Sequence, residues 1–171
     1  MRLERFDDAI RYLEESLKFR VQIVNPSDQK LIVPLNNLGI AYLKIKNLEK
    51  AREYIFKAFG IDENDVSTLN NVALMFSLEE NNDFALHHYG LALDKLMESK
   101  GEYNEEYMKI ANSKAALYVK MKDYENAEVF LRKSLHICEE TFPEKVDFIE
   151  KTKERLEHLM RVKEKNEKAF L

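Results

Sequence analysis

Few residues in this sequence have types and spacings that could do chemistry. His87 and His88 are adjacent, and His136 lies two positions before Cys138. On a helix, residues one or two positions apart point in different directions, so neither pair can chelate one metal ion. The sequence also lacks a glycine-rich phosphate loop, a nucleophile elbow and a His-Glu-x-x-His motif. We therefore expect no catalytic residues, no metal site and no bound cofactor.

Asparagine offers a different kind of chemistry. Its side-chain amide carries a donor and an acceptor, which can pair with the N–H and C=O groups of a peptide backbone. Such residues recur before apolar runs, as Asn36-Asn37, Asn70-Asn71 and Asn112-Ser113. We expect the amides to hold the main chain of a bound peptide. The alternative, that asparagine stabilises packing between repeats or simply tolerates solvent, stays open.

The elements that must position these amides are repeated. The first copy contains six residues of one pattern: Leu38, Gly39, Tyr42, Ala51, Ile55 and Ala58. Matching residues occur 34 positions later, and a third set follows after a further 42 positions. Within a copy the apolar residues recur at the spacing of one helical face. A period of this length predicts pairs of helices.

Small residues in the pattern indicate how each pair packs. Gly39, Ala51 and Ala58 are small where their neighbours are large, which lets two helices approach closely. Asn47 and Asp123 stand between the helices of their copies, where a side-chain oxygen can accept the first N–H groups of the second helix. Each copy is therefore predicted to be helix, short turn, helix.

The pattern resembles the tetratricopeptide repeat, whose consensus has Leu-Gly, Tyr, Ala, an aromatic residue and Ala at these spacings. The 42-residue variant resembles the repeats of kinesin light chains and related adaptors. The resemblance implies an all-α fold, a right-handed α-solenoid of antiparallel helix pairs with a C-terminal capping helix. It departs at Lys114, where the family prefers Leu, and at Pro34, which we expect to kink or delay a helix. The implied parts of one domain, 1–171, are 5–25 (the second helix of a truncated repeat), the repeats 28–62, 66–100 and 104–140, and the cap 144–170.

In the resembled family, the first helices line the inner, concave surface of the stack. The resembling adaptors use one row of asparagines there, which carries over to Asn37 and Asn71. Neighbouring positions complete an expected peptide groove. The full expected set is Asn36, Asn37, Asn70, Asn71, Asn112, Ser113, Ile40, Leu74, Lys44, Lys109 and Lys120.

Composition limits the partners. With 27 basic and 31 acidic residues, the net charge of −4 provides no broad attraction to nucleic acid. No apolar run approaches the ~18 residues of a membrane span, and the charged start is unlike a signal peptide. Cys138 is the single cysteine, so there is no disulfide framework. We expect a cytoplasmic protein with a protein or peptide ligand and no membrane contact.

The first helix suggests a second kind of function. Residues 5–25 are predicted to form a second helix that lacks its first, either because the chain begins inside a repeat or because it comes from a longer array. Repeats bury their apolar faces on neighbours, so we expect an open face formed by Phe6, Ile10, Leu13 and Leu17. The two hypotheses are thus a non-enzymatic adaptor that binds a peptide in its groove, and a structural or regulatory segment that self-associates or packs on another domain. The latter includes a homodimer through the N-terminal face.

Overall fold

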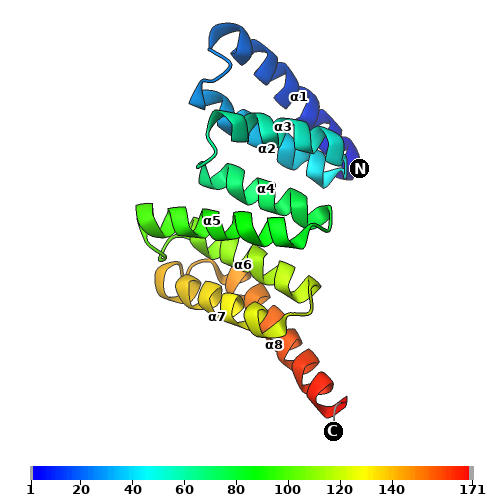
Figure 1. Cartoon of the computed structure of the whole chain (residues 1–171), viewed down its shortest axis with the longest axis vertical. Coiled ribbons are helices and arrows are strands. Elements are labelled where there is room, and N and C mark those ends of the chain that lie inside the picture. Colours follow the sequence, from blue (N-terminus) through cyan, green and yellow to red (C-terminus); the bar gives the residue numbers. More distant parts are fainter. Residues whose placement is uncertain (1, 170–171) are drawn as a thin grey trace. The chain divides into compact units, whose positions relative to one another are not determined.

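The computed structural model describes residues 2–169, with side chains for residues 7–166. This part of the chain is all α-helical apart from one short 3₁₀ turn, η1, and contains no strand (Figure 1). The chain divides into two compact units, Met1–His88 and Tyr89–Leu171, and the boundary between them in the sequence falls within α5. The elements are α1 (Arg2–Ile23), η1 (Gln29–Leu31), α2 (Ile32–Lys44), α3 (Leu48–Ile61), α4 (Val66–Leu78), α5 (Asn82–Lys100), α6 (Glu105–Lys120), α7 (Tyr124–Thr141) and α8 (Val146–Ala169).

The first unit is built around the hairpin of α2 and α3, against which α1 and α4 pack. Its core includes Leu38 and Ile55, which are fully buried. Gly39 lets the two helices approach: a Cβ atom there would lie 2.4 Å from Cγ1 of Ile55. The small residues predicted to mark the close contact therefore do so.

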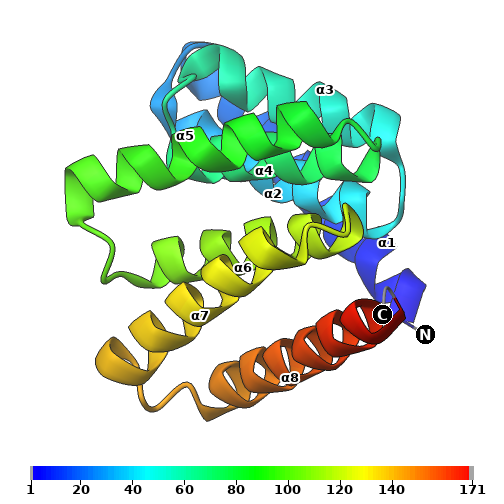
Figure 2. The same ribbon diagram turned by 60° about the horizontal axis from the view of Figure 1, so that its bottom comes forward.

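The second unit is built around the hairpin of α6 and α7, and α8 packs alongside α7 (Figure 2). Ala115 of α6 and Ala127 of α7 are fully buried at the helix contact, beside Leu131 and Leu159. Leu159 brings α8 into the same core. The predicted terminal helix therefore covers the apolar side of the last complete hairpin.

The connections within the hairpins follow one design. Lys46, Glu80 and Lys122 each end the turn after a first helix with a left-handed backbone, at φ of 61°, 63° and 62°. The side chains of Asn47 and Asp123 then accept hydrogen bonds from the N–H groups three residues later, both at 3.1 Å. These caps satisfy donors that the first turn of a helix cannot pair internally.

Pro34 lies in the first turn of α2, whose regular helix begins at Ile32 after the 3₁₀ turn. A first-turn residue has no intrahelical partner for its N–H, so proline costs little there. The regular helix therefore begins at Ile32 instead of near residue 28, and Pro34 in its first turn does not require a kink.

The open face of α1 differs from the one predicted. Ile10 is buried, and Leu13 and Leu17 pack against the core formed with α2 and α3. The expectation that these side chains are open is wrong, because they make the contact that holds α1 on the unit. Phe6, the fourth residue of that prediction, lies outside the part whose side chains are described.

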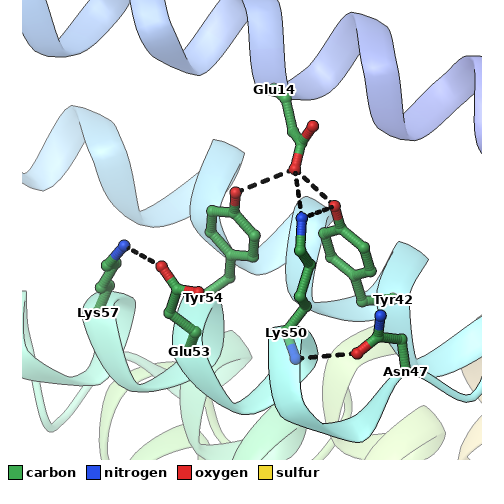
Figure 3. A network of polar contacts seen from close by, with 7 residues as sticks. All are labelled: Glu14, Tyr42, Asn47, Lys50, Glu53, Tyr54 and Lys57. Carbon is green, nitrogen blue, oxygen red and sulfur yellow. Dashed lines mark hydrogen bonds and ion pairs between the residues drawn. The ribbon is translucent and has the colours of Figure 1, made fainter.

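A polar network also attaches α1 to the hairpin (Figure 3). Oε1 of Glu14 accepts hydrogen bonds from the hydroxyls of Tyr42 at 2.5 Å and Tyr54 at 3.2 Å, and lies 3.6 Å from Nζ of Lys50. The hydrogen bond from Tyr42 lowers the pKa of the Glu14 carboxyl, and desolvation opposes this. Burial and the same carboxylate raise the pKa of Tyr54 to about 12. The network is therefore most favourable with Glu14 ionised and both tyrosines neutral.

Candidate interaction surface

A cavity of about 450 Å³ lies between α6, α7 and α8 in the second unit. Val119, Leu131 and Leu159 are among its apolar walls. Arg155 and His158 also line it and are exposed. The complete lining is Ala116, Val119, Tyr124, Leu131, Glu154, Arg155, His158, Leu159 and Val162. Its size and composition fall within the range of ligand-binding clefts in proteins, which combine apolar walls with a few polar groups.

The expected amide of α6 lies beside a residue of this cavity. Nη1 of Arg155 donates a hydrogen bond to Oδ1 of Asn112 at 3.1 Å. The adjacent Ser113 donates its hydroxyl to the backbone carbonyl of Lys109 at 3.1 Å. Nζ of Lys109 in turn pairs with Glu105 at 2.5 Å, which lowers the pKa of that carboxyl. Among the predicted residues of α6, Asn112 thus contacts the cavity residue Arg155, whereas Ser113 and Lys109 make contacts within α6.

The asparagines of α2 and α4 are not equally accessible. Asn36 is buried, and its Nδ2 donates a hydrogen bond to Oγ1 of Thr68 at 2.8 Å. Asn36 therefore joins α2 to α4, which is the packing role left open as an alternative. Asn71 is also buried, Asn70 is half-buried and Asn37 is exposed.

The remaining expected groove positions divide into apolar and basic residues. Ile40 and Leu74 are half-buried and pack against the core of the first unit. Lys44 and Lys120 are exposed in the last turns of α2 and α6. Ile40 and Leu74 both contact the core, so their role in binding a ligand stays a prediction.

Sequence reasoning missed the residues that α8 contributes to the cavity. Adding the 42-residue period to Ser113, Ala116 and Lys120 leads to Arg155, His158 and Val162. The repeat register therefore contained the signal. Residue type alone does not give this signal, because the charged residues of α8 are also typical of a cap with a solvated outer face.

Other chemistry has little support in the described residues. They contain no group of three or more histidine, cysteine, aspartate or glutamate side chains placed to hold a metal ion. Within the same part of the chain, no helix combines the length and apolar character needed to cross a membrane. Burial raises the pKa of the Cys138 thiol, which makes it a poor nucleophile at neutral pH.

Comparison with known proteins places the repeats in a family. One tetratricopeptide-repeat model matches residues 1–64, and a second matches residues 108–145, which together exceed half of the chain. No curated protein sequence matches. Among solved structures, BtubC (BKLC) from P. vanneervenii is similar, with a TM-score of 0.69 and 20% identity over 94% of this chain and 75% of that one.

Two further structures have the same fold. The putative kinesin light chain repeats of Podospora anserina align with a TM-score of 0.68 and 11% identity, covering 96% of this chain and 90% of that one. The N-terminal domain of stress-induced protein-1 from C. elegans aligns with a TM-score of 0.55 and 22% identity, covering 76% and 99%. Repeat models, helix pairs and solved structures agree, and this chain belongs to the tetratricopeptide-repeat family.

Proposed function

We propose that the chain is a non-enzymatic adaptor that binds a peptide segment of a partner protein along its first helices. The cavity beside α6 and α8 is the observation that carries this proposal. Tetratricopeptide repeats in general are protein-interaction modules, and the cavity offers a concave apolar site on the side of α6 where the asparagine row was expected. The proposal includes a cytoplasmic location, which agrees with a chain that contains a single cysteine.

The contacts suggest different roles for the apolar and the polar residues of the second unit. The apolar walls formed by Val119, Leu131 and Leu159 suit one bulky apolar side chain of the ligand. Asn112 and Arg155, already hydrogen-bonded to each other, can exchange that bond for contacts to the ligand backbone. In the first unit, Asn37 is exposed, so its amide is accessible for a contact of the same kind.

Selection from a peptide library tests this proposal directly. A displayed library of random dodecapeptides is selected on the intact chain, and the affinity of the selected peptides is measured by calorimetry. Ala116→Phe should fill the cavity from its exposed edge and weaken binding at least tenfold. Asn112→Ala should cost about 0.5–1.5 kcal/mol of binding free energy, as expected for the loss of one hydrogen bond.

The matched control is Val129→Phe, which adds a ring at an exposed position of α7 outside the cavity. Circular dichroism should show the same helical content for all variants. Peptides that bind Ala116→Phe as tightly as the original chain would rule out the cavity as the ligand site.

A second candidate function is association through α1, either with a second copy or with another domain. Tyr12, Phe19 and Ile23 favour it because they are large apolar residues that remain exposed on one helix. Sedimentation velocity over a range of concentrations measures self-association directly. A monomer at every concentration would exclude the homodimer.

A further inference from the structure

The exposed apolar residues of α1 form a regular stripe. Ala9, Tyr12, Ser16, Phe19 and Ile23 follow one another at three- and four-residue intervals, which places them on one side of a helix. The side chains of Tyr12, Phe19 and Ile23 are 63%, 68% and 82% exposed. This stripe lies next to Leu13, which packs on the core. A helix that covered the stripe would therefore extend the existing core of the first unit.

The repeat register shows what covers the same stripe elsewhere in the chain. Adding 42 to Ala9, Tyr12 and Ser16 leads to α3, at Ala51, Tyr54 and Ala58. Ala51 and Ala58 are fully buried in the hairpin with α2. In α3, therefore, this face is covered by the antiparallel first helix of its own repeat.

An aromatic pair lies at this contact in each repeat that has both of its helices. The residue equivalent to Tyr12 lies against an aromatic ring of the first helix, with centroids 5.6, 5.7 and 5.8 Å apart in the pairs Tyr42–Tyr54, Phe76–His88 and Tyr118–Phe130. The first-helix ring always follows a small residue by three positions, as in Gly39-x-x-Tyr42. Tyr12 instead has the guanidinium of Arg11 over its ring, at 5.2 Å from the centroid.

A serine provides a second match. Ser16 corresponds to Ser134 of α7, whose buried hydroxyl donates a hydrogen bond to the backbone carbonyl of Met108 in α6 at 2.9 Å. Ser16 has the same side chain at the same repeat position, but it is exposed on α1. The stripe of α1 thus carries the small residues, the aromatic ring and the hydroxyl that α7 uses to hold a first helix.

We propose that this face of α1 is the docking site for an amphipathic helix of a partner protein. The helix runs antiparallel to α1 and carries a small residue followed, three positions later, by an aromatic residue. Its small residue lies on Ala9 and Leu13, its ring stacks on Tyr12, and one of its backbone carbonyls accepts the hydroxyl of Ser16. This inference does not depend on the peptide cavity of the second unit.

The chain's own helices are poor occupants of this site. α2 and α6 already cover α3 and α7 within their hairpins. In α8 the register places Glu157 and Met160 where the small and aromatic residues are required. The equivalent Ala73 and Ala115 are fully buried at their helix contacts, so a glutamate side chain has no room in this geometry. The occupant that we propose is a helix of a partner protein rather than α8 of a second copy.

The test uses a helix of known fit as the probe. A fluorescein-labelled synthetic peptide with the sequence of residues 104–121 contains Ala115 and Tyr118, the small and aromatic residues of α6. Fluorescence anisotropy measures its binding to the intact chain. A control peptide carrying Ala115→Glu and Tyr118→Ala should bind at least tenfold more weakly.

Two chain variants locate the site. Ser16→Glu places a carboxylate in the stripe and should weaken binding of the probe at least tenfold, whereas Gln22→Glu makes the same charge change on a different side of α1 and should leave it within twofold. Both residues are exposed, so circular dichroism should be unchanged. The proposal fails if the probe does not bind the unaltered chain, or if Ser16→Glu binds it equally well. The unaltered chain could also form a dimer that Ser16→Glu dissociates but that the probe does not dissociate. That result would assign the face to a second copy and would also overturn the proposal.

Discussion

The α2–α3 and α6–α7 hairpins have the same architecture, but of three neighbouring positions they differ in residue type at two and in the surroundings of the side chain at the third. Asn36, Leu38 and Gly39 of α2 correspond to Asn112, Lys114 and Ala115 of α6. Both hairpins keep a buried alanine on the second helix, a left-handed turn residue and a side-chain cap. The comparison shows that the features that form the hairpin are constant, while the residues around them adapt to whichever helix packs next.

The largest expected effect concerns how closely the helices approach. Gly39→Ala introduces a methyl group that α6 has at Ala115, but 2.4 Å from Cγ1 of Ile55. Overpacking typically costs ~1–3 kcal/mol, and the better helix propensity of alanine returns up to ~1 kcal/mol. We expect a net destabilisation of about 1–2 kcal/mol, measured by urea denaturation.

The residue of the second helix that faces this small position explains why α6 tolerates an alanine there. Leu131 stands where the first hairpin has Ile55, and it branches one carbon further from the backbone. The double variant Gly39→Ala/Ile55→Leu should therefore recover most of the loss. If the two changes are simply additive, the proposed difference in shape is not the reason.

The next effect separates the two asparagines. Asn36→Ala removes a buried hydrogen bond to Thr68 and should destabilise the chain by about 1–2 kcal/mol. Asn112→Ala removes a hydrogen bond to the exposed Arg155 and should cost less than about 0.5 kcal/mol. Chemical denaturation of both variants, compared side by side, measures the difference. Equal losses would mean that Asn112 also has a packing role.

The helix pairs and their period were predictable because small, apolar and capping residues are local requirements of a hairpin. Gly39 and Asn47 could be placed from spacing alone, and the structure places them at the helix contact and at the cap. The burial of the Asn36 side chain could not be predicted in the same way. Whether a polar residue of a first helix faces solvent or the next helix depends on Thr68, which lies in another repeat.

The open face of α1 was harder for a related reason. Leu13 and Phe19 are both large and apolar, and helical periodicity alone does not say which of them meets α2. The 42-residue register resolves the question, because it aligns Tyr12 and Ser16 with residues whose partners are known. The α8 side of the cavity follows from the same register. Register carried more information about the candidate sites than residue type did.

A smaller effect is expected at the lysine of α6. Lys114 is half-buried over the ring of Phe130, with Nζ 4.7 Å from the centroid, and burial lowers the pKa of its ammonium. Lys114→Leu copies Leu38 and should stabilise the chain by about 1 kcal/mol, since apolar burial of a side chain is worth ~1.5–3 kcal/mol and the lost cation–π contact ~0.5–1 kcal/mol.

The pH dependence gives this prediction a sign. The folded chain holds the Lys114 proton less tightly than the unfolded chain, so the free energy of unfolding contributed by this residue rises as pH increases through the lowered pKa toward 10.5. The advantage of Lys114→Leu in thermal melts should therefore shrink between neutral pH and pH 10. An advantage that stays constant would show that the buried charge is not its origin.

The smallest effect should be the same in both hairpins. Lys46 and Lys122 adopt left-handed backbones at φ of 61° and 62°, where a Cβ atom is unfavourable and glycine is not. The N–H of Asn47 bonds to the carbonyl of Tyr42 at 3.0 Å, and that of Asp123 to Tyr118 at 2.9 Å, so the two turns have matching backbone bonds.

Lys46→Gly and Lys122→Gly should each stabilise the chain by about 0.5 kcal/mol, because the strain relieved exceeds the added freedom of the unfolded chain. Both lysines are exposed, so no packing term should separate them. Denaturant midpoints of the two single variants and of the double variant measure this, with additivity expected between sites so far apart in sequence. A gain in one hairpin and a loss in the other would mean that the lysine side chains, rather than the shared turn, determine the stability of these connections.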